Sequence, residues 1–168
     1  MTLPITSPDS VDLLDELKEV LDAEQALAEA ERNEAEAASK LARSKAQLKA
    51  HPDPSWGWAE QVAEDERALE AAREAIRRAR EQVRDRLRRL AAQAEQAAGT
   101  ERRKSKAERK AEDVAGKARD LADKTAPGDD AKPLDRESRV KGYLALLNAI
   151  IAMEDVEHDV VEDALKKA

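Results

Sequence analysis

The stretch that decides the fold is residues 13–48, LLDELKEVLDAEQALAEAERNEAEAASKLARSKAQL. It contains neither Pro nor Gly, and one position in every seven forms a row that is apolar except at Glu34. The row is Leu13, Val20, Leu27, Glu34, Leu41 and Leu48. A repeat of seven is typical of a coiled-coil seam. We therefore expect one long helix, with Ser10 as its N-cap.

A second stretch, residues 59–98, repeats this arrangement. Its row is Val62, Leu69, Ile76, Val83, Leu90 and Ala97. Between the two stretches lies HPDPSWGW, residues 51–58, with two prolines and a glycine, which is a strong turn signal. Each predicted helix has about 40 residues and so a length of about 60 Å at 1.5 Å per residue.

Register and charge favour an antiparallel arrangement of these two helices. Folding at the turn places Leu48 opposite Val62 and Leu41 opposite Leu69, and only Glu34 opposite Ile76 breaks the apolar match. Each stretch is acidic in its first half and basic in its second, so antiparallel folding puts acid opposite base at both ends. We predict a long antiparallel coiled-coil hairpin over residues 10–98, with its turn at 51–58.

The remaining segments complete an all-α prediction. Residues 1–9 are an N-terminal extension. Residues 99–134 are basic and polar, have weak helical periodicity and several Gly and Pro, and are interpreted as a flexible linker. Residues 135–168 form a C-terminal amphipathic helix, the most hydrophobic part of the chain.

Composition excludes several classes of chemistry. The chain has 168 residues, 40% of them charged, a formal net charge of −7 and no cysteine, so disulfides and thiolate zinc sites are absent. Glu154 and His158 share a helix face, as two ligands of a metal ion would, but a solvated acidic face is the better interpretation of this segment. We expect no enzyme, no catalytic residue, no metal and no cofactor, because no convergent polar constellation can be assembled.

We expect a soluble, cytoplasmic protein, which can still be part of a larger particle. The first twelve residues have no basic or apolar segment of the kind that marks a secretory signal. The longest apolar stretch, residues 143–153, is about half the length that spans a bilayer, so no membrane span is predicted.

Candidate protein-binding residues lie at the turn and at the opposite end of the hairpin. A two-helix seam leaves a second leucine stripe on the first helix uncovered, and the C-terminal helix either packs there or docks on another chain. One Trp of the turn is expected to cap the seam and the other to contact a partner. The candidates are Leu14, Leu17, Leu21, Trp56, Trp58, Tyr143, Leu147, Ile150 and Ile151.

These features predict a non-enzymatic structural or adaptor protein that assembles through helix–helix contacts, with itself or with a larger complex. One alternative is a scaffolding or assembly factor of a large particle, including a viral one. The other is a nucleic-acid-associated helical protein with phosphate contacts in a basic segment. The residues of that segment are Arg102, Arg103, Lys104, Lys106, Arg109 and Lys110.

Overall fold

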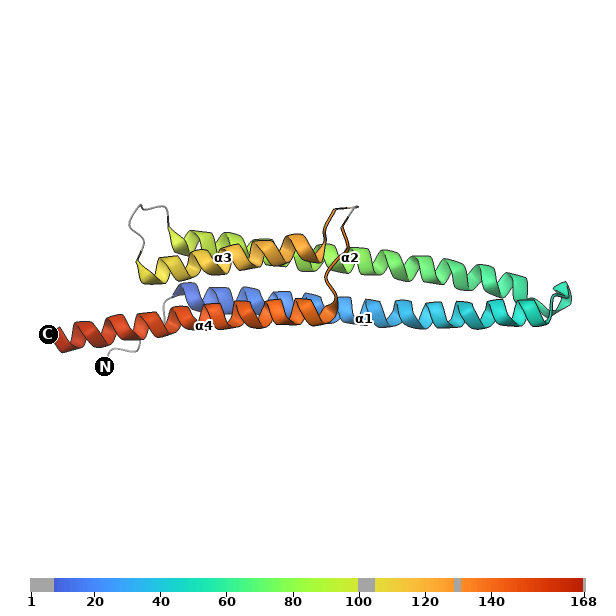
Figure 1. Ribbon diagram of the computed structural model, residues 1–168, viewed down its shortest axis with the longest axis horizontal. Helices are drawn as coiled ribbons and strands as arrows, with labels where there is room; N and C mark the ends of the chain where they lie inside the picture. Colours follow the sequence, from blue (N-terminus) through green and yellow to red (C-terminus); the bar gives the residue numbers. More distant parts are fainter. Residues whose placement is uncertain (1–7, 100–104, 129–130, 168) are drawn as a thin grey trace. The chain divides into compact units, whose positions relative to one another are not determined.

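The structure is a computed structural model that describes residues 8–99, 105–128 and 131–167, with side-chain burial described between residues 10 and 153 (Figure 1). The described part of the chain forms four α-helices and no strand, which confirms the all-α prediction. The helices are α1 (Pro8–Ala50), α2 (Trp58–Ala98), α3 (Lys106–Thr125) and α4 (Arg136–Lys167). A short 3₁₀ turn, η1 (Pro54–Trp56), lies between α1 and α2.

The chain divides into two compact units. The bundle unit comprises Met1–Ala23 and Gln82–Ala168, and the paired-helix unit is Glu24–Glu81. Helices α1 and α2 therefore each contribute to both units, whereas α3 and α4 belong to the bundle unit alone.

Helix α3 corrects the interpretation of residues 99–134 as a flexible linker. Ser105 and Glu108 form a capping box at its start, in which the Ser105 hydroxyl accepts from the Glu108 amide at 3.2 Å and the Glu108 carboxylate accepts from the Ser105 amide. The helix buries a face made largely of alanine, and Gly116 lies on its exposed side. The buried residues are Ala111, Val114, Ala115, Ala118, Leu121, Ala122 and Thr125. Alanine adds little to a count of bulky residues, yet it favours helix and allows close packing.

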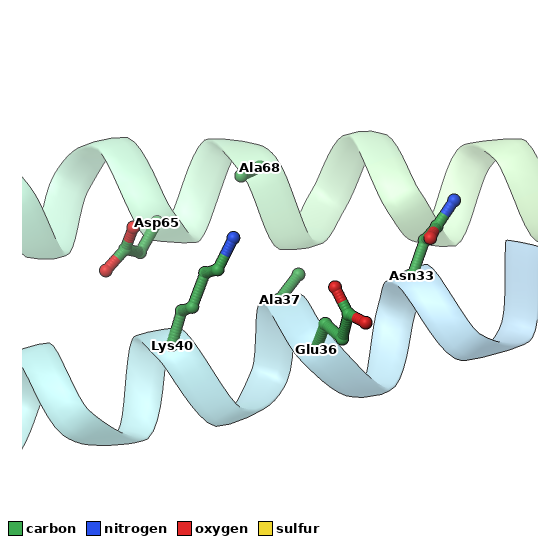
Figure 2. A pocket seen from close by; sticks show the side chains of 6 residues that line it. All are labelled: Asn33, Glu36, Ala37, Lys40, Asp65 and Ala68. Carbon is green, nitrogen blue, oxygen red and sulfur yellow. The ribbon is translucent and has the colours of Figure 1, made fainter.

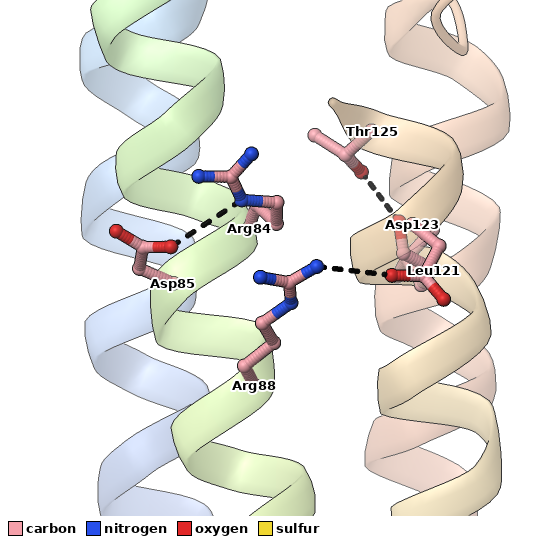
Figure 3. A network of polar contacts seen from close by, with 6 residues as sticks. All are labelled: Arg84, Asp85, Arg88, Leu121, Asp123 and Thr125. Atoms are coloured by element: carbon pink, nitrogen blue, oxygen red, sulfur yellow. Dashed lines mark hydrogen bonds and ion pairs between the residues drawn. The ribbon is translucent and has the colours of Figure 1, made fainter. Parts of the chain in front are cut away.

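In the bundle unit, ion pairs join α2 to α1 and to α3, the helices that precede and follow it in the sequence. Arg86 of α2 pairs with Glu19 of α1 at 3.0 Å. Arg88 of α2 pairs with Asp123 of α3 at 3.4 Å, as Figure 3 shows. Figure 3 shows α1 behind α2 and α4 behind α3, and Figure 1 shows α4 running antiparallel to the first turns of α1. The four helices thus form a ring in which α4 neighbours both α3 and α1.

All four helices supply the core of the bundle unit. The large buried apolar side chains are Leu13, Leu17 and Val20 from α1, Val83, Leu87 and Leu90 from α2, Val114 and Leu121 from α3, and Tyr143, Leu146, Ile150 and Met153 from α4. Burial of a Leu or Ile side chain contributes about 1.5–3 kcal/mol, so these residues outweigh the alanine layers between them.

The paired-helix unit has a much thinner core. Leu41, Val62 and Leu69 form its buried cluster, against which Leu48 and two alanines pack. Ion pairs link its two helices, among them Lys45 with Glu66 at 2.9 Å. The turn is held by Asp53, whose carboxylate accepts from the Ser55 amide at 2.9 Å, and by Gly57 at a φ of 69°.

A buried polar contact also joins the helices of this unit. The Ser44 hydroxyl donates to the Asp65 carboxylate, which also accepts from Gln61 at 3.0 Å. Replacing Ser44 by Ala is expected to lower the free energy of unfolding by about 1–3 kcal/mol, because Asp65 loses a donor while it stays buried. Urea denaturation measures this loss. The control is Ser39→Ala, at an exposed position of the same helix, and an equal loss in both variants would contradict the contact.

The start of α4 makes stability depend on pH. The Asp135 carboxylate accepts from the Ser138 amide at 2.8 Å, and this bond, followed by one to the Ser138 hydroxyl, holds the pKa of Asp135 below its usual 3.8. A lowered pKa contributes stability above the unfolded-state value, and that contribution is lost as the pH falls through the folded-state pKa.

We expect Asp135→Asn to retain a capping oxygen but to lose this titration. The stability advantage of the wild type over this variant should therefore be complete well above the usual pKa of 3.8 and shrink as the pH falls below it. Thermal unfolding at a series of pH values tests this, and a difference independent of pH would contradict it.

Candidate protein-binding site

The turn between α1 and α2 carries one exposed aromatic side chain. Trp56 is 60% exposed and stacks on His51, with ring centroids 4.8 Å apart. Trp58, the first residue of α2, is half-buried, and its indole Nε1 has no acceptor within the part of the chain that the structure describes. The two candidate Trp residues thus differ in environment, and only Trp56 presents most of its surface to solvent.

A small pocket of about 250 Å³ opens between the helices of the paired-helix unit (Figure 2). It lies where alanines face each other across the thin core, and charged side chains surround it. Its lining residues are Asn33, Glu36, Ala37, Lys40, Asp65 and Ala68. Asp65 already accepts hydrogen bonds from Ser44 and Gln61.

The candidate residues of the predicted leucine stripe and of the C-terminal helix differ in their burial. Leu17, Tyr143 and Ile150 are buried in the core of the bundle unit. Leu14 and Leu147 are half-buried, and Leu21 and Ile151 are exposed. The α4 helix therefore packs on its own chain through one face and leaves other apolar side chains uncovered.

The uncovered side chains of α1 lie on the side that faces α4. Glu16 and Glu19, which precede the buried Leu17 and Val20, make the contacts to α2. Successive residues of a helix are rotated by about 100° about its axis, because a helix has 3.6 residues per turn. A residue that follows a buried position therefore lies on the opposite flank of the helix from a residue that precedes one. The apolar residues at such positions, all exposed or half-buried, are Val11, Leu14 and Leu21.

The same reasoning applies to α4. Gly142, which precedes the buried Tyr143, packs against Leu121 of α3, so residues that follow buried positions face away from α3 and toward α1. The apolar residues there, all exposed or half-buried, are Val140, Leu144, Leu147 and Ile151. Leu144 is 54% exposed, and its neighbour Tyr143 only 3%.

We call the two stripes together the α1–α4 surface: Val11, Leu14, Leu21, Val140, Leu144, Leu147 and Ile151. Val11, Val140 and Leu144 were not among the sequence candidates. Their signal was present, since Val140, Leu144, Leu147 and Ile151 are spaced by four, three and four residues. An apolar surface shared by two helices is suited to binding and offers no group for acid–base or nucleophilic chemistry.

The predicted phosphate contacts are only partly described. Lys106 and Arg109 are exposed and Lys110 is half-buried in the first turns of α3, whereas Arg102, Arg103 and Lys104 lie outside the described residues. The side chains of Glu154 and His158 also lie outside them. Elsewhere in the described chain, no three His, Cys, Asp or Glu side chains are grouped to hold a metal ion.

No helix in the described ranges combines the length and the apolarity needed to cross a membrane. Comparisons of the chain with protein-family models, with curated proteins and with solved structures find no match.

Proposed function

We propose that this protein is a non-enzymatic adaptor that joins a larger protein assembly through helix–helix contacts at the α1–α4 surface. The observation that carries the proposal is the pair of uncovered apolar stripes on adjacent helices. Val11, Leu21, Val140, Leu144 and Ile151 are all more than 40% exposed. Single exposed apolar residues are ordinary, but several of them on two neighbouring helices are typical of an interaction site.

In this proposal the paired-helix unit is an antiparallel coiled coil. Three ion pairs join its helices in the order expected for that arrangement: Lys45 with Glu66, Glu34 with Arg73, and Glu31 with Arg80. Glu34, which interrupts the apolar row, is half-buried and meets a cation in Arg73. Flanking charges of this kind favour one orientation of a coiled coil.

The proposal is tested by the size of the assembly that the chain forms in its own cells. A tagged wild-type chain in a gentle extract should elute with a larger assembly in gel filtration. Replacing Leu144 and Ile151 by Lys should shift the chain to the position of the purified protein, because both side chains are exposed and their loss leaves the core intact.

The control replaces Trp56, an equally exposed apolar residue outside the bundle unit, by Lys. This variant should leave the assembly unchanged if the α1–α4 surface makes the contact. A wild-type chain that elutes in the extract as the purified protein does would overturn the proposed function. Removing α4 altogether is a poorer test, since Tyr143, Leu146 and Ile150 belong to the core.

A further inference from the structure

We draw no further inference here: the strongest candidate, the set of exposed apolar side chains on α1 and α4 of the bundle unit, belongs to the α1–α4 surface already described, and nothing in the structure shows what covers it.

Discussion

Replacing Ile150 by Ala is expected to lower the free energy of unfolding by about 2–5 kcal/mol, whereas the same change at Ile151 should cost less than about 1 kcal/mol. Ile150 is fully buried and Ile151 is 42% exposed, although the two are neighbours on α4. The change at Ile150 removes buried methyl groups and leaves a cavity in the bundle core. The change at Ile151 removes surface that water already reaches.

Urea denaturation of the two purified variants, followed by circular dichroism, measures both losses. The pair is well matched, because residue type, substitution and helix are the same and the difference in helix propensity cancels. Equal losses at the two positions would contradict the packing of α4 described above. If Ile150→Ala is unfolded at 25 °C, the same comparison is made near 10 °C, where stability is closer to its maximum.

A glycine pair gives the second large effect. Gly142→Ala is expected to be less stable than Gly116→Ala by about 1–3 kcal/mol. A Cβ at Gly142 would lie 2.7 Å from both terminal methyl carbons of Leu121, which is itself buried, whereas a Cβ at Gly116 would meet no atom within 4 Å. Each substitution gains the same helix propensity, about 1 kcal/mol, so the difference isolates the crowding between α3 and α4.

Thermal or urea unfolding decides the outcome for both glycine variants. Gly116→Ala should be more stable than the wild type, because the residue is helical, exposed and unobstructed. Equal gains in the two variants would show that α4 does not approach α3 closely at Gly142. The same result would remove the reason to place Val140 and Leu144 on the side of α4 that faces α1.

The periodic helices could be predicted from the sequence to within a few residues. The turn signal gave the end of α1 and the start of α2, since unbroken helical segments end where the Pro and Gly residues of the turn begin. The prediction of Ser10 as the N-cap of α1 was wrong, because the helix begins at Pro8 and Ser10 is buried within it. Helix α4 was expected from residue 135 and begins at Arg136. In each case a broad apolar stripe and clear end signals pointed the same way.

Helix α3 could not be predicted with the same certainty. Its buried face is mostly alanine, and Gly116 and the surrounding charges obscure the period. The capping box of Ser105 and Glu108 was a readable signal, because the two residues are spaced as Ser-x-x-Glu before a helical segment. The sequence does not reveal that α2 and α4 lie beside α3, and it is close packing against these helices that makes the small residues of α3 stabilising.

The candidate site shows a similar limit. Ile150 and Ile151, or Tyr143 and Leu144, are equally apolar, and a single helix does not reveal which of the two faces the core. That choice depends on which helices lie on either side of α4. The structure supplies it through the contact of Gly142 with Leu121 and through the order of the four helices.

Labelling of single cysteines tests the adaptor proposal most directly, because the chain has no cysteine of its own. Variants with Cys in place of Leu144, Ile150 or Ala145 are treated with a thiol reagent, first as purified protein and then within the assembly recovered from cells. In the purified protein, we expect fast labelling at 144 and 145 and slow labelling at 150, as their exposure dictates. In the assembly, position 144 should become slow while 145 stays fast. Labelling at 144 that is equally fast in both states would contradict the account.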